Sequence, residues 1–195
     1  MERLTGPAVK ISIQERAETD PDTELTVADI ESWELENGDI PDNAIVILHT
    51  GRGKHYGDTQ KYFGRPGDLT LPEDDTEHLH FPGVSPAAAR WLVDRRNISG
   101  LGVDTPSTDR GQSKVFQTHQ VLGRANVWGL ENVANTDLLP ARGFLVYNLV
   151  HKLEGGSGGP TRVIAVLDRK TAGSGAAWQR YTPSLVVLCL ALFNM

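Results

Sequence analysis

The sequence contains a single cysteine, Cys189, among its 195 residues. One thiol excludes a disulfide framework and any cysteine-rich metal site. Basic runs are also missing, and the net charge is −6, so we expect no nucleic-acid partner. The opening residues MERLTGPAVK contain no apolar core of the length that a secretory signal requires. What remains, 39% hydrophobic and 23% charged residues, is the composition of a globular domain.

Long hydrophobic runs are absent as well. The longest one, LVVLCLALFNM at the carboxyl end, is shorter than the ~20 residues needed to span a bilayer. We expect a folded domain over residues 1–167 and a polar, small-residue tail over 168–195. The tail has two interpretations: a final strand, which we favour, or a lipid-anchor addition signal with small residues at 173–176. Only the second would give a membrane partner.

Strand-like and helix-like segments alternate along the chain, which predicts an α/β fold. The helix LTVADIESWEL has Thr26 as its expected N-cap, with Asp29 three residues on. Another helix has Ser85 as cap and Pro86 at its first position. Helices are expected over 25–35, 85–96 and 113–122, strands over 9–13, 43–50, 97–104, 126–133, 143–153 and 161–167, and a long loop over 51–81.

His119 and Glu131 stand out as a candidate pair of metal ligands. We expect His119 on a helix and Glu131 near the end of the following strand, an arrangement that can bring both to one edge of a sheet. The pair alone is weak evidence, because a helical histidine is more often a hydrogen-bonded structural residue. Glu131 lies in an apolar stretch, where a buried carboxylate needs a partner, either a metal ion or an arginine.

The loop VDTPSTD is a second candidate site. Asp104, Thr105 and Ser107 could orient a substrate, or they could cap backbone groups in a turn, as could Asp109. For His49, at a strand end, we expect a structural role. The loop histidines 55, 78 and 80 are expected to be solvated. The segment GGSGGP lacks the lysine of a phosphate-binding loop, so we expect no nucleotide there.

Several motifs resemble those of the cyclase family, which includes bacterial-type kynurenine formamidases and isatin hydrolases. The most specific are GVDTPSTD (102–109), the spacing of His119 and Glu131, and LEGGSGGPTRV (153–163). Three upstream segments match in order: LTGPAVKISI, AIVILHTGRG and HFPGVSPAAARWL. The resemblance covers residues 4 to 167 and corresponds to the carboxyl-terminal half of the family's domain.

The resemblance implies an α/β fold of the swivelling β/β/α kind that lacks its amino-terminal portion. It also implies a zinc- or manganese-dependent hydrolase of amide or lactam C–N bonds. The activity that we expect is like that of a kynurenine formamidase (arylformamidase) of tryptophan catabolism. By resemblance, His119 and Glu131 are metal ligands, and Asp104, Thr105 and Ser107 lie near the substrate.

One family motif, His-x-Gly-Thr-His-x-Asp-x-Pro-x-His, does not occur in this sequence. A catalytic site usually takes three or more protein ligands, so two would bind a metal weakly. This leaves two hypotheses: a metal-dependent hydrolase acting on a small amide or lactam, or a truncated non-catalytic fragment that keeps a partner-binding role. An incomplete sheet would also favour a homo-oligomer.

Overall fold

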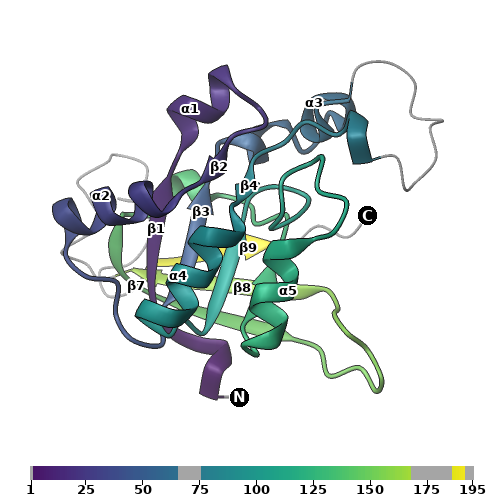
Figure 1. Ribbon diagram of the computed structural model, residues 1–195. Helices are drawn as coiled ribbons and strands as arrows, with labels where there is room; N and C mark the ends of the chain where they lie inside the picture. The colour runs from purple at the N-terminus through teal and green to yellow at the C-terminus, as the bar shows by residue number, and fades with distance from the viewer. Residues whose placement is uncertain (1, 66–75, 168–185, 192–195) are drawn as a thin grey trace.

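The computed structural model describes residues 2–65, 76–167 and 186–191 of the chain (Figure 1). The main sheet has seven strands in the order β6-β5-β3-β1-β7-β8-β9. The strands are β1 (Thr5–Ser12), β3 (Ile45–His49), β5 (Gly100–Val103), β6 (Trp128–Leu130), β7 (Arg142–Val150), β8 (Thr161–Leu167) and β9 (Val186–Ala191). A separate pair joins β2 (Glu24–Leu25) to β4 (Gly83–Val84).

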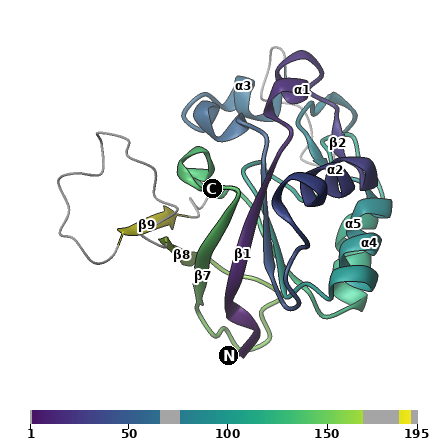
Figure 2. The ribbon, with the colours of Figure 1, turned by 90° about the vertical axis from the view of Figure 1, so that its left-hand side faces the viewer.

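The helices are α1 (Gln14–Thr19), α2 (Val27–Asn37), α3 (Thr59–Phe63), α4 (Pro86–Arg96) and α5 (Gln117–Arg124). Figure 2 shows α2, α4 and α5 together on one side of the sheet. Short 3-10 turns complete the described elements: η1 (Glu2–Leu4), η2 (Arg52–His55), η3 (Thr76–His78) and η4 (Thr136–Leu138).

The sheet has a parallel half and an antiparallel half. Strands β1, β3, β5 and β6 run parallel, whereas β7, β8 and β9 each run antiparallel to the neighbour before them. The parallel strands therefore end at one edge, and they deliver the residues that follow them to that edge. His49 ends β3, Asp104 follows β5 and Glu131 follows β6. Ligand sites of open α/β sheets characteristically lie at this edge.

Strand β3 is buried on both faces, which fits its run of apolar residues. Val46 and Leu48 pack in the core under the helices, whereas Ile45 and Ile47 pack in a second core on the opposite face. The core under the helices also receives Ile30 and Trp33 from α2 and Leu92 from α4. A central strand held on both faces gives the site a rigid base.

Most of the expected elements are present, and the predicted α/β class is confirmed. Helix α2 begins with the expected capping box, in which the Thr26 side chain accepts from the Asp29 amide and the Asp29 side chain accepts from the Thr26 amide. Ser85 caps α4 as expected. The residues between β7 and β8, including GGSGGP, connect the two strands of an antiparallel pair.

The structure differs in detail from the expected elements at three places. The expected loop 51–81 contains η2, α3 and η3, although residues 66–75 lie outside the described residues. Helix α5 begins at Gln117 rather than at 113, because Phe116 has a left-handed φ of 47° that interrupts the helix. Helix α1 was not expected, because its six residues, QERAET, show little apolar periodicity.

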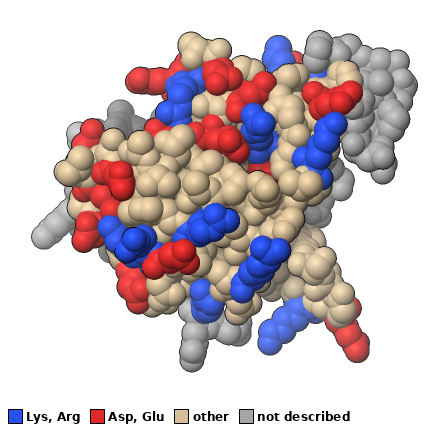
Figure 3. Space-filling model, in the orientation of Figure 1, with Lys and Arg blue, Asp and Glu red and all other residues tan. Residues whose placement is uncertain are grey.

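Residues 186–191 of the carboxyl-terminal apolar run form strand β9, which pairs with β8, as in the strand interpretation of the tail. Residues 173–176, the small-residue segment of the lipid-anchor interpretation, lie outside the described residues. None of the helices in the described parts of the chain has both the length and the apolar character needed to cross a bilayer. On the face seen in Figure 3, acidic and basic side chains are interspersed.

Candidate metal site and adjoining cavities

His119 lies in the first turn of α5, held by a carboxylate from the preceding loop. Its Nδ1 is 2.6 Å from Asp109 Oδ2. The same carboxylate accepts from the main-chain amides of Thr118 and His119, at 2.9 and 3.1 Å. Asp109 therefore both caps α5, whose first amides have no helical partner, and fixes the orientation of the imidazole ring.

The other imidazole nitrogen faces Glu131. His119 Nε2 lies 3.1 Å from Glu131 Oε1, so the structure brings the two predicted ligands together. Two atoms bonded to one zinc ion at ~2.1 Å would be separated by about the same distance. The two side chains are 47% and 34% exposed, which leaves them open to solvent or a ligand.

Glu131 and Asp109 also set the protonation of the histidine. Hydrogen bonds to Asp109 and then to Glu131 raise the pKa of His119 to about 9, because both carboxylates stabilise the imidazolium. Burial pushes the pKa of Asp109 upward, but the hydrogen bonds from His119 and from the two main-chain amides outweigh it, and the pKa is lowered. A metal ion would have to displace the proton of His119.

A cavity of about 550 Å³, here called the His119 cavity, opens beside this pair. Its lining includes Thr108, His119, Glu131, Asn148 and residues 157–161 from the connection before β8. The cavity therefore combines β6 and the loop after β5 with the antiparallel half of the sheet. Among the described residues, no group of three or more His, Cys, Asp or Glu side chains is arranged to hold a metal ion. His119 and Glu131 fit two of the ligands that such an ion needs.

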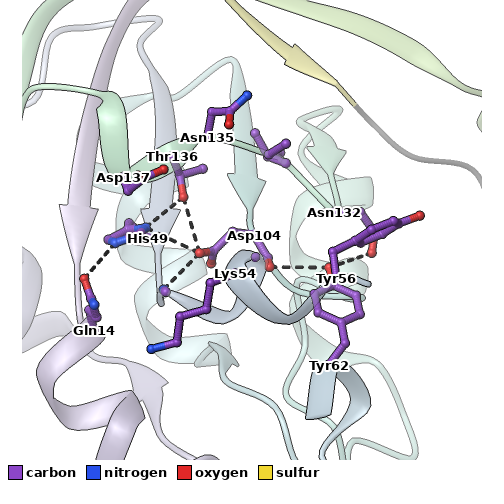
Figure 4. A pocket seen from close by; sticks show the side chains of 14 residues that line it. Gln14, His49, Lys54, Tyr56, Tyr62, Asp104, Asn132, Asn135, Thr136 and Asp137 are labelled. Carbon is purple, nitrogen blue, oxygen red and sulfur yellow. Dashed lines mark hydrogen bonds and ion pairs between the residues drawn. The ribbon is translucent and has the colours of Figure 1, made fainter. Parts of the chain in front are cut away.

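A second cavity, of about 540 Å³, lies at the ends of β3 and β5 and is here called the His49 cavity (Figure 4). His49 is buried, with Nδ1 2.7 Å from Thr136 Oγ1 and Nε2 2.9 Å from Gln14 Oε1. Asp104 lies next to it, with Oδ2 3.4 Å from His49 Nδ1. Both imidazole nitrogens have protein partners, which agrees with the expected structural role of His49.

Asp104, the first residue of the predicted substrate loop, is only 1% exposed. Its carboxylate accepts from the Thr50 amide and hydroxyl, at 2.9 and 2.7 Å, and from the Gly51 amide, at 2.9 Å. These contacts tie the end of β5 to the turn after β3. These contacts match the alternative in which the loop residues cap backbone groups in a turn. Asp104 nevertheless also lines the His49 cavity.

Thr105 and Ser107 are bound within the same loop. Thr105 is fully buried and its hydroxyl donates to the Ser107 carbonyl at 2.9 Å. The Ser107 hydroxyl accepts from the Asp109 amide at 3.2 Å. The loop thus positions Asp109 against His119, and substrate contact by Asp104, Thr105 and Ser107 stays a prediction.

Asn132 separates the two cavities and lines both. Its Oδ1 accepts from the Tyr62 hydroxyl at 2.8 Å, and burial raises the pKa of Tyr62. No local pattern indicates Asn132, Thr136 or Gln14 as site residues, because their partners are far away along the chain. Asp109 was recognisable as a polar residue of the loop, but its pairing with His119 was not.

Comparisons with known proteins agree on one family. Residues 1–110 match the Cyclase family model. The chain is 33% identical over 173 residues to an isatin hydrolase of Roseibium aggregatum, a match that covers 87% of this chain and 62% of the relative. The chain therefore spans less than two thirds of the length of that curated relative.

Solved structures give the same result. Isatin hydrolase A from Ralstonia solanacearum is 34% identical with a TM-score of 0.77, over 86% of this chain and 62% of that one. An isatin hydrolase bound to the product analogue thioisatinate is 33% identical with a TM-score of 0.75, over 84% and 60% of the two chains.

Proposed function

Since the chain belongs to the cyclase family, we propose that it carries part of the active site of a metal-dependent hydrolase that cleaves an amide or lactam C–N bond. The observation that carries the proposal is the placement of His119 between Asp109 and Glu131, with Nε2 directed at Glu131 Oε1. A histidine ligand whose other nitrogen is bound to a carboxylate is the usual arrangement at catalytic metals. His119 and Glu131 are the proposed ligands.

The metal is proposed to be zinc or manganese, because one imidazole and one carboxylate suit both. Such an ion would polarise the substrate carbonyl and activate water for attack on it. Neighbouring residues hold the two proposed ligands in place. Asp109 orients the imidazole of His119, and the Thr108 amide donates to Glu131 Oε1 at 3.3 Å. The swivelling β/β/α arrangement belongs to the same proposal.

The proposed substrate is a small aryl lactam. The similar proteins are isatin hydrolases, and the structure of one of them holds the product analogue thioisatinate. Addition of water across a lactam C–N bond gives a carboxylate and an amine. The expected formamidase reaction breaks the same kind of bond in an open-chain formamide, so both substrates belong in the test.

A second candidate is a non-catalytic fragment that keeps a partner-binding role. It is favoured by one observation: within the described residues only two ligands converge, where a catalytic ion usually takes three. In that case the chain would bind metal weakly and turn over neither substrate.

The experiment is metal titration of the dialysed chain with Mn²⁺ and Zn²⁺, followed by hydrolysis assays with isatin and N-formylkynurenine. We expect His119→Ala and Glu131→Gln each to weaken metal binding. His151→Ala is the matched control, because His151 is exposed in the connection after β7. Turnover with bound metal would establish the hydrolase, whereas weak metal binding without turnover would establish the fragment. Unchanged metal affinity in both variants would show that the ligands are wrongly assigned.

A further inference from the structure

A third cavity, of about 530 Å³, is lined largely by basic side chains. It lies beside η2 and α3, the segment that Figure 1 shows at the upper right, and shares no lining residue with the His119 or the His49 cavity. No carboxylate is among its described lining residues, in a chain with a net charge of −6. Its basic residues are Arg52, His55, Lys61, Arg65 and His80.

Two of these side chains lie next to carboxylates. Lys61 Nζ lies 2.9 Å from Asp58 Oδ2, and His80 Nδ1 lies 2.9 Å from Asp22 Oδ1. The latter contact also corrects the expectation that His80 is simply solvated. Neither contact involves one of the two arginines of the cavity.

Arg52 and Arg65 have no carboxylate partner in the described part of the chain. Arg52 donates through Nε to the Tyr62 carbonyl at 3.0 Å and through its terminal nitrogen to the His80 carbonyl, both uncharged acceptors. The Nε and one terminal nitrogen of Arg65 are buried and have no hydrogen-bond partner among the residues that the structure describes. A buried guanidinium without an acceptor is costly, so such a group is expected to have a ligand.

His55 reports the same excess of positive charge. Burial lowers the pKa of His55, and the positive charges of Lys54, Arg52 and Lys61 lower it further, against an opposing effect of the Asp58 carboxylate. The electrostatic potential in the cavity therefore disfavours an added proton and favours an anion.

We propose that this cavity, here called the Arg52 cavity, is a binding site for an oxyanion, either a carboxylate or a phosphate, held by the guanidinium groups of Arg52 and Arg65. Guanidinium groups bind both kinds of anion through paired N–H donors. Arg65 supplies the unpartnered donors, and Arg52 supplies a second charge that is fixed by its two main-chain acceptors. The site is independent of the proposed metal ligands, so either proposal can fail while the other stands.

The test is calorimetric titration of the metal-free chain with sodium phosphate and, separately, with sodium acetate, at constant ionic strength in chloride. We expect saturable binding at one site per chain for at least one of the two anions, which identifies the oxyanion that is preferred. Arg65→Gln should weaken that binding at least tenfold, because the buried, unpartnered guanidinium donors of Arg65 are removed.

Arg90→Gln is the matched control, because Arg90 lies exposed on α4, away from the cavity, and the variant loses the same charge. Its anion affinity should equal that of the unmodified chain. Thermal unfolding of both variants shows whether they are folded. Absence of saturable binding by the unmodified chain, or equal affinity in the folded Arg65→Gln variant, would overturn the proposal.

Discussion

His119 contacts two carboxylates, which differ in burial and in the imidazole nitrogen that they face. Asp109 is 4% exposed and fixes the ring through Nδ1, whereas Glu131 is 34% exposed and shares the open side of the ring. The buried Asp109 is therefore suited to positioning the imidazole, and the more exposed Glu131 is suited to binding the same metal ion as His119. This division can be tested one residue at a time.

Asp109→Asn should weaken metal binding at His119 by ~10–100-fold, the usual effect of losing the carboxylate behind a histidine ligand. An amide keeps the size of the side chain but removes the charge that orients the imidazole. Competition with a fluorescent chelator measures the affinity, and Asp94→Asn on the exposed face of α4 is the control. Equal affinities in the two variants would contradict the positioning role of Asp109.

Asp29 offers a pH-dependent test of local stability. Burial opposes ionisation of Asp29, but hydrogen bonds from Arg16 and Thr26 outweigh it and lower its pKa from 3.8 to about 2. Because the pKa in the folded state lies below the ordinary value, the stabilisation is present above pH ~4 and is lost as the pH falls toward 2.

We therefore expect Asp29→Ala to lower the free energy of unfolding by about 1 kcal/mol at pH 7, the usual cost of losing a helix cap. The difference from the unmodified chain should shrink as the pH falls from 4 toward 2. Urea denaturation at several pH values measures it. A difference that stays constant down to pH 2 would show that the ionised carboxylate is not what stabilises α2.

At the scale of elements, the packing of β5 against β6 depends on a glycine, Gly100. A Cβ at Gly100 would lie 2.4 Å from the Trp128 ring, which is too close for any real contact. Trp128 is itself fixed, because its Nε1 donates to the Arg3 carbonyl at 2.8 Å. The close approach of β5 to this ring requires glycine.

Gly100→Ala should accordingly destabilise the fold by about 1–3 kcal/mol, the range for overpacking a core. Gly123 in α5 is the matched control, because a Cβ there would meet nothing within 4 Å. Gly123→Ala should be neutral or stabilise by up to about 1 kcal/mol, since alanine favours a helix. Chemical denaturation of both variants measures the effects, and a neutral Gly100→Ala would mean that the tryptophan moves aside easily.

At the scale of the whole molecule, one sheet face carries exposed apolar side chains. Leu145 and Leu149 on β7 are 41% and 51% exposed, and Leu145 is paired in register with Val166 of β8. Tyr147 lies between them on the same face, paired with Ile164. Exposed apolar surface of this kind favours association, in line with the homo-oligomer that we predict from the sequence.

The double variant Leu145→Glu/Leu149→Glu should shift the chain toward the monomer, because charges on this face would have to be buried on association. Light scattering across a range of concentrations measures the molar mass. Leu35→Glu is the control, because Leu35 is 89% exposed but lies on α2 rather than on β7. A chain that is monomeric at every concentration before substitution would refute the predicted oligomer.

The sequence by itself determined the features that depend on neighbours along the chain. The capping box of α2, the Ser85 cap of α4 and the strands rich in β-branched residues follow from local spacing, and the structure has them. The closeness of His119 and Glu131 also follows from local sequence. The two residues are only twelve positions apart, and a helix that leads directly into the next strand can bring its first turn close to the end of that strand.

Only the tertiary structure decided how the site is assembled. His49 meets Thr136 across 87 positions, and the unpartnered nitrogens of Arg65 share a cavity with Arg52. Asp109 reaches the start of α5 through a turn whose shape depends on the buried contacts of the loop, not on a local pattern. Periodicity encodes which face of an element is apolar, but it carries no information on which distant polar groups will meet when those faces are buried.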